Sequence, residues 1–101
     1  MKKLSMVVHS SLQQQLADLL RNLQLESFMF SHIEEHSSQL KHDAFLSARD
    51  RVVGYVPKIR VDVILEDERA LTLLDEIRHS QVSFSGKGMY WITEIEDAGE
   101  F

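Results

Sequence analysis

The order of two apolar spacings along the chain limits the folds that it can adopt. Runs that read as strands, most with alternating apolar residues, occupy 4–8, 27–33, 59–65 and 89–95. Leucines at helical spacing occupy 11–23, and a second helical stripe after Asp67 comprises Ala70, Leu71, Leu74 and Ile77. The resulting order, β-α-β-β-α-β, predicts a ferredoxin-like α+β sandwich, an antiparallel sheet with both helices on one face.

Polar residues mark where the two helices are expected to begin. Ser10 and Ser11 precede the first helix, and glutamines follow at the spacing of a capping box. Asp67 precedes the second apolar stripe, and we expect it to cap the second helix.

Two helices on one face leave the other face of the sheet uncovered. Alternation predicts that this face carries Val7, Met29, Ile64, Tyr90 and Ile92. Such a face is too apolar to stay in water, so we expect a homo-oligomer to cover it.

Composition narrows the class of protein. The 101 residues suffice for a single domain, 1–101, with one long polar loop at about 36–55. The net charge of −5 argues against nucleic acid as a partner. Cysteine is absent, and no apolar run approaches the ~20 residues that a membrane span needs. We therefore expect a cytoplasmic protein without membrane insertion.

A cluster of histidines and acids marks the end of the second strand. His32, Glu34 and His36 share one side of an extended chain, with Glu35 and His42 nearby. Imidazole and carboxylate are ligands for zinc, copper or nickel, so His32, Glu34, His36 and His42 are candidate metal ligands. The alternative is a polar strand end that runs into a solvated loop.

Two basic features are candidates for binding an anion. Lys58 follows Pro57 at the start of a strand, where its backbone is well held. The turn Gly86-Lys87-Gly88 offers backbone N–H groups, although a plain connecting turn is the alternative interpretation. No serine, histidine and acid share a catalytic motif, and we expect no enzymatic activity.

The segment Gly54-Tyr55-Val56-Pro57-Lys58-Ile59-Arg60-Val61-Asp62-Val63-Ile64-Leu65-Glu66-Asp67 resembles the third strand of PII nitrogen regulatory proteins. Gly86-Lys87-Gly88-Met89-Tyr90-Trp91-Ile92 resembles their last strand, and Gln39 precedes Pro57-Lys58 at the family's distance. The resemblance implies a homotrimer that binds a small effector in clefts between subunits. It assigns effector binding to Gln39, Lys58, Gly86, Lys87 and Gly88, and binding of a protein target to the long loop.

The sequence departs from the PII pattern at positions that affect which ligand we expect it to bind. Arg51 stands where the family has its modified tyrosine, and Met89 replaces a lysine. The arginines that grip phosphate are replaced by the acidic end Asp97-Ala98-Gly99-Glu100-Phe101, which disfavours ATP as the cofactor.

The segment 45–54 is more similar to a PII-like group whose genes tend to lie beside heavy-metal efflux systems. The divalent-cation-tolerance proteins (CutA) share the trimeric architecture that this resemblance implies. The sequence therefore leaves three hypotheses. The first is a regulator with a small effector and a protein target, such as a membrane transporter. The second is a protein that binds or responds to a divalent metal. The third is an interaction domain without a small ligand.

Overall fold

A computed structural model of the chain describes residues 1–38, 54–84 and 88–101. Its elements are β1 (Lys2–His9), the 3₁₀ helix η1 (Ser10–Leu12), α1 (Gln13–Asn22), β2 (Met29–Glu35), β3 (Val56–Leu65), α3 (Asp67–Arg78) and β4 (Met89–Glu94). Most of the predicted loop, 36–55, lies outside the described residues. Within the described ranges, no helix has the length and apolar character to cross a bilayer.

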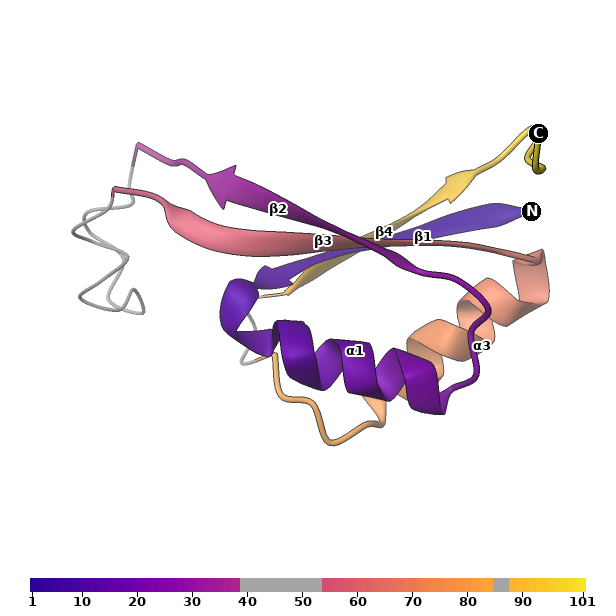
Figure 1. Ribbon diagram of the computed structural model, residues 1–101, viewed down its shortest axis with the longest axis horizontal. Coiled ribbons are helices and arrows are strands. Elements are labelled where there is room, and N and C mark those ends of the chain that lie inside the picture. The colour runs from indigo at the N-terminus through magenta and orange to yellow at the C-terminus, as the bar shows by residue number, and fades with distance from the viewer. Residues whose placement is uncertain (39–53, 85–87) are drawn as a thin grey trace.

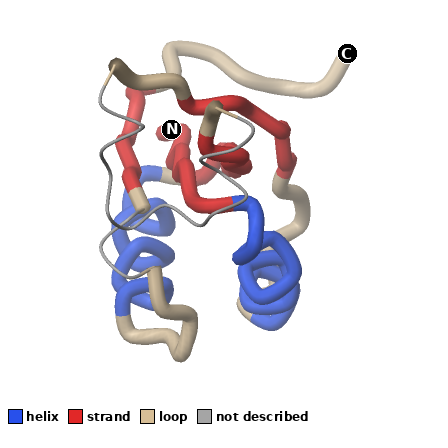
Figure 2. Tube along the Cα trace, turned by 90° about the vertical axis from the view of Figure 1, so that its left-hand side faces the viewer, coloured by secondary structure: helices blue, strands red, loops and turns tan. Residues whose placement is uncertain are grey.

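The four strands form one antiparallel sheet in the order β2-β3-β1-β4. The two central strands, β1 and β3, pair without interruption from Lys2–Leu65 to His9–Lys58. Both helices lie on the same side of the sheet, and the segment after β4 leaves on the other side (Figures 1 and 2). The predicted ferredoxin-like α+β fold is confirmed.

The hydrophobic core lies between the sheet and the two helices. Alternate residues of the central strands face the helices, and the cluster comprises Leu4, Met6, Val8, Leu16, Leu20, Ile59, Val61, Val63, Leu73, Leu74 and Ile77. Fully burying one leucine or isoleucine stabilises a fold by about 1.5–3 kcal/mol. The apolar spacings seen in the sequence therefore define this core.

The predicted helix caps are wrong in detail. The first helix begins as a 3₁₀ turn, and the Nδ1 atom of His9 accepts a hydrogen bond of 3.1 Å from the backbone N–H of Ser11. The N-cap of α3 is Glu66, and Asp67 is the first helical residue. The Asp67 carboxylate instead forms an ion pair with the α-amino group of Met1 at 2.7 Å. This ion pair connects the start of β1 to the first turn of α3.

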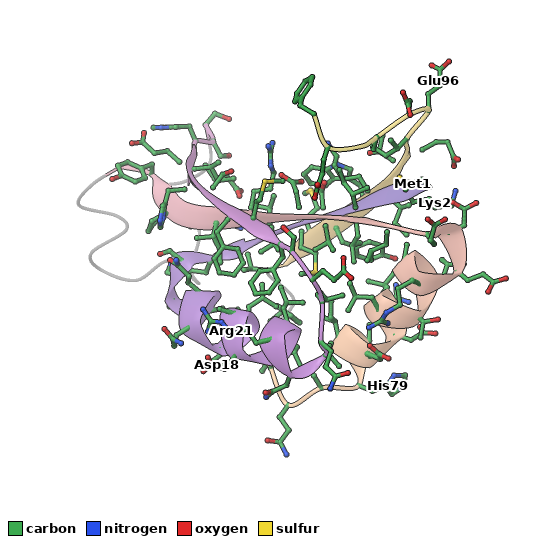
Figure 3. The ribbon with its side chains drawn as sticks, turned by 45° about the vertical axis from the view of Figure 1, so that its right-hand side comes forward. Met1, Lys2, Asp18, Arg21, His79 and Glu96 are labelled. Carbon is green, nitrogen blue, oxygen red and sulfur yellow. The ribbon has the colours of Figure 1, made fainter. Side chains whose placement is uncertain are left out.

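Ionic contacts join the start of β1 to the elements on both sides of it. Met1 contacts Asp67, Lys2 contacts Glu94 of β4, and the N–H of Ile95 donates to the Met1 carbonyl at 3.0 Å. Figure 3 shows Met1 and Lys2 at this end of the sheet. The hydrogen bond to Asp67 raises the pKa of the Met1 amino group, and the same bond lowers the pKa of Asp67. The pair therefore stabilises the fold between these two pKa values. Its contribution is lost as pH falls through the Asp67 value or rises through the Met1 value.

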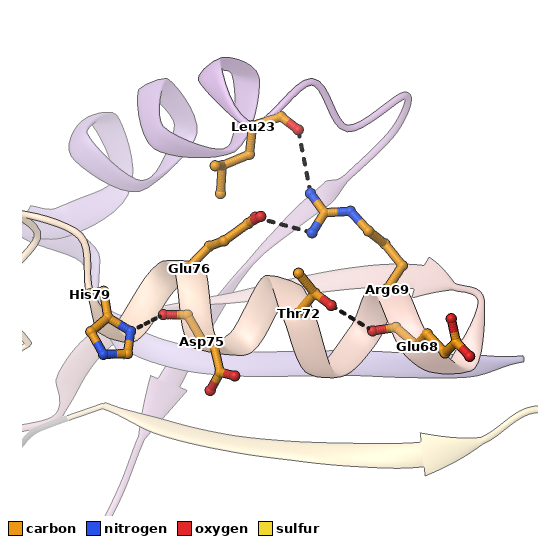
Figure 4. A network of polar contacts seen from close by, with 7 residues as sticks. All are labelled: Leu23, Glu68, Arg69, Thr72, Asp75, Glu76 and His79. Atoms are coloured by element: carbon orange, nitrogen blue, oxygen red, sulfur yellow. Dashed lines mark hydrogen bonds and ion pairs between the residues drawn. The ribbon is translucent and has the colours of Figure 1, made fainter.

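One arginine joins the two helices (Figure 4). Arg69 of α3 donates to the Leu23 carbonyl at the end of α1, at 3.5 Å, and to the Glu76 carboxylate at 3.0 Å. This contact satisfies one of the carbonyls that the end of a helix leaves without a partner.

The uncovered face of the sheet differs from the prediction at β4. Tyr90 pairs with Met6 and Ile92 with Leu4, so both lie on the helix side of the sheet. Met89 and Trp91 take their place on the open face and are 64% and 38% exposed. The run Met89-Tyr90-Trp91-Ile92 has no alternation, and a shift of one residue moves every side chain to the other face.

A polar cluster lies in the middle of this open face. Asp62 accepts a hydrogen bond from the Ser5 hydroxyl at 2.7 Å and from Arg60 Nε at 3.0 Å. Ser5 is 1% and Asp62 8% exposed, so these bonds replace water for a buried carboxylate. Trp91 and Met29 lie in the same cross-strand row, on either side of this pair.

We predict that Ser5→Ala lowers the free energy of unfolding by about 1–3 kcal/mol, because it leaves a buried carboxylate oxygen without its donor. Urea unfolding followed by circular dichroism measures the change. Ser27→Ala, at an exposed position, is the matched control and should have little effect. Equal stability of the two variants would show that the Ser5–Asp62 bond contributes nothing.

Candidate functional site

The candidate site lies at the edge of the sheet where β2 ends and β3 begins. Glu35 pairs with Val56 in the last register position, so both ends of the segment 36–55 start from this point. Gly54 adopts a φ of 82°, which favours glycine, as the chain enters β3. Pro57 then fixes the backbone beside Lys58.

Lys58 is held on the open face of the sheet at this end. It lies between His9 of β1 and Ile33 of β2 in the register, and its side chain is only 13% exposed. Its Nζ atom is 3.0 Å from the Glu35 carboxylate, which is half exposed. The Lys58 charge is therefore balanced by a carboxylate at a position that has little contact with water.

A second polar group comes from the same strand end. Glu34 points away from Glu35, as alternation requires, and its carboxylate lies 3.0 Å from Nε2 of His36. The ring of Tyr55 lies beside that of His36, with 5.6 Å between the ring centroids. The two sides of one strand end therefore carry a lysine–glutamate pair and a histidine–glutamate pair.

The structure brings together only some of the residues predicted from the sequence. Of the candidate metal ligands, Glu34 and His36 are in contact, and among the described residues no group of three or more suitable side chains could hold a metal. Gln39, His42, Gly86 and Lys87 lie outside the described residues.

Gly88 lies at the same end of the sheet as Lys58, on the other side of β1. Met89, the next residue, pairs with Val7, whereas Lys58 pairs with His9. A Cβ atom at Gly88 would lie 3.4 Å from side-chain atoms of Phe84 and Val8. Close packing is therefore one reason for glycine at this position.

Sequence reasoning missed the partners of these residues. The sequence places Glu35 beside the candidate metal ligands, but its carboxylate is bound to Lys58. Tyr55 was noted only as part of a strand motif, and its contact with His36 was not predicted. Both contacts depend on the register of β2 against β3, which no spacing in the sequence reveals.

Comparisons with known proteins, together with the fold, indicate a PII-like class of protein. Over 98 residues the chain is 24% identical to a "Nitrogen regulatory protein P-II" of Rhizobium meliloti (strain 1021), covering 96% of this chain and 88% of that protein. A protein of the same description from Azospirillum brasilense is 21% identical over 100 residues, with 96% and 88% covered.

The chain belongs to the family described as "Protein of unknown function (DUF3240)", which matches residues 1–101. A crystal structure of a DUF3240 family protein from Shewanella baltica OS155 superposes with a TM-score of 0.69. It covers 99% of this chain and 94% of that one at 17% identity, a likeness that shows the fold alone. The resemblance to PII proteins seen in the sequence is confirmed.

Proposed function

We propose that this protein is a PII-like regulator without enzymatic activity, which binds a small effector and signals its presence to a protein target. The support comes from relatives named for nitrogen regulation and from the shared fold. The observation that carries the proposal is Lys58, a mostly buried cation at the base of the segment 36–55. An effector bound there would act directly on the point from which that segment starts.

The Glu35 carboxylate indicates how an anionic effector would bind. It already occupies Lys58 Nζ at 3.0 Å, so a carboxylate or phosphate of the effector has to replace it. Because Glu35 is the last residue of β2, its release would alter the strand end that leads into the loop. We infer that exchange of one anion for another at Lys58 is the signal.

Charge limits which effector fits. Glu94, Glu96, Asp97 and Glu100 follow one another through the end of the chain. Because Glu94 pairs with Lys2, this acidic segment begins at the opposite end of the sheet from Lys58. We propose a small anion such as a dicarboxylate as the effector, with ATP disfavoured by the net charge of −5. We propose that Gln39, Gly86, Lys87 and Gly88 complete the site. We propose cytoplasmic target proteins or the cytoplasmic side of a membrane transporter as partners of residues 36–55.

We predict opposite effects for two substitutions at this pair. Lys58→Ala should weaken binding of 2-oxoglutarate by about 10-fold or more, the value of a charge-assisted hydrogen bond. Glu35→Gln should strengthen it, because the competing carboxylate becomes neutral. Isothermal titration calorimetry with 2-oxoglutarate and ATP measures both effects.

Lys3→Ala is the matched control, because Lys3 lies on the same face at the opposite end of β1. No heat from either anion with the unsubstituted protein would exclude the proposal. Equal binding of 2-oxoglutarate by Lys58→Ala and Lys3→Ala would show that Lys58 does not bind the anion.

The contact between His36 and Glu34 favours a second candidate function, the binding of a divalent metal. We propose that His36 and Glu34 provide two ligands, with His32 and His42 as the remaining candidates. Imidazole and carboxylate together suit zinc, copper and nickel. Because histidine must be neutral to bind a metal, affinity should fall as the pH is lowered through the imidazole range.

We predict that His36→Ala reduces the affinity for Zn²⁺, Cu²⁺ or Ni²⁺ by about 10-fold or more, as loss of one ligand of a small set should. Calorimetry at pH 7.5 and at a pH of about 5.5 measures affinity and its proton dependence. The matched control is His79→Ala, at an exposed histidine whose Nδ1 contacts the Asp75 carbonyl. Unchanged affinity in His36→Ala would rule out this metal site.

The open face of the sheet supports a proposed homotrimer. Met29, Ile64, Met89 and Trp91 are all exposed on it, around the buried Ser5–Asp62 pair. Association through this face would cover the apolar side chains and place the loop ends of neighbouring copies near one another. Clefts between copies could then complete the effector site.

We predict that Trp91→Glu converts the oligomer to a monomer, since the new carboxylate would be buried in the interface. Sedimentation velocity at micromolar concentration measures the change. Leu71→Glu is the control, because Leu71 is 58% exposed but lies on α3, on the other side of the sheet. A monomeric unsubstituted protein would contradict the homotrimer.

A further inference from the structure

A cavity of about 130 Å³ lies on the helix side of the sheet, away from Lys58. Its apolar walls come from β1, α3 and the segment that leads to β4: Met6, Val8, Leu74, Ile77 and Phe84. Met6, Val8, Leu74 and Ile77 belong to the buried core, so the inner wall is apolar and held by packing.

The sequence around the cavity explains why this space exists. Helix α3 ends at Arg78 and β4 begins at Met89, and residues from both ends line the cavity. Gly88, at the start of β4, has no side chain to occupy the gap beside Phe84 and Val8. An apolar cavity of about 150 Å³ holds a benzene molecule, so this one accommodates a single ring or a short branched hydrocarbon.

The mouth of the cavity carries a matched pair of polar groups. Arg78 donates a hydrogen bond to the Tyr90 hydroxyl, and its guanidinium carbon lies 5.1 Å from the centre of the Tyr90 ring. Because the Tyr90 oxygen accepts this bond, its own hydrogen is available to donate. The phenol and the guanidinium therefore present donors side by side at the rim of an apolar space.

Two nearby negatively charged or polar groups, the Asp75 carboxylate and the carbonyls at the end of α3, do not occupy these donors. Asp75 Oδ1 lies 3.8 Å from Nη1 of Arg78, beyond hydrogen-bond distance and mostly exposed to water. At the end of α3, the carbonyls of Asp75 and Ile77 accept hydrogen bonds from His79 and Ser80. The last turn of the helix therefore has partners for these two carbonyls.

We propose that this cavity binds a small apolar carboxylate, with an aromatic or branched aliphatic body inside and the carboxylate at Arg78 and Tyr90. A carboxylate accepts two hydrogen bonds at once, and guanidinium is the side chain best shaped to donate them. A ring of six carbons matches the volume. The site is separate from Lys58, which lies on the other face of the sheet.

The test is a titration of the ¹⁵N-labelled protein with benzoate and phenylacetate, followed by ¹H–¹⁵N correlation spectra. We expect shifts of the amides of Val8, Leu74 and Tyr90, and a dissociation constant on the order of 1 mM or tighter for a ligand of this size. Benzyl alcohol has the same ring without the charge and should bind at least about 5-fold more weakly.

Variants separate the head group from the apolar body. Arg78→Gln should weaken benzoate binding about 10-fold, whereas Arg21→Gln, at an exposed arginine of α1, should not change it. Tyr90→Phe keeps the ring and should weaken binding by a smaller factor. Leu74→Phe should abolish binding by filling the cavity, and its spectrum shows directly whether the variant is folded.

Three results would overturn the proposal. One is the absence of shifts at about 20 mM benzoate, a concentration well above the largest dissociation constant expected for a ligand of this size. The second is equal binding of benzyl alcohol and benzoate. The third is equal loss of binding in Arg78→Gln and Arg21→Gln, which would indicate a general effect of charge.

Discussion

The pairing of β1 with β3 is the constraint on which the rest of the structure depends. These strands form an unbroken antiparallel ladder from Lys2–Leu65 to His9–Lys58, and the outer strands are added to it on either side. Its alternation sends Leu4, Met6 and Val8 toward the helices and leaves Ser5 and Val7 on the open face. One ladder therefore sets both the core and the polar cluster at Asp62.

The same ladder determines what each end of the molecule can do. At one end, ion pairs hold Met1 to Asp67 of α3 and Lys2 to Glu94 of β4. At the other end, Lys58 is the last position of the ladder, and its charge meets Glu35 from the neighbouring strand. This ion pair, with a lysine side chain that has little exposure, is the feature on which the proposed effector site rests.

Much of the fold could be predicted from the sequence because it depends on local period. The spacing of Leu16 and Leu20, or of Val61 and Val63, is a property of the chain itself, and it identified helices, strands and core residues. Prediction failed at Tyr90 and Ile92, where four apolar residues in a row carry no alternation, and at Asp67, whose carboxylate binds Met1. The candidate site was predicted only in part: Lys58 was singled out, but its partner Glu35 was not.

The sequence by itself determined the order of the elements, the apolar faces and the resemblance to PII proteins, because these are written in residue types and their spacing. Only the tertiary structure decided which polar groups meet. Glu35 with Lys58, Ser5 with Asp62, and Arg78 with Tyr90 are pairs from different strands or from a helix and a strand. Their contact depends on register and on where a helix ends. Those features are fixed by packing of the whole domain, because a shift of one residue would reverse every face.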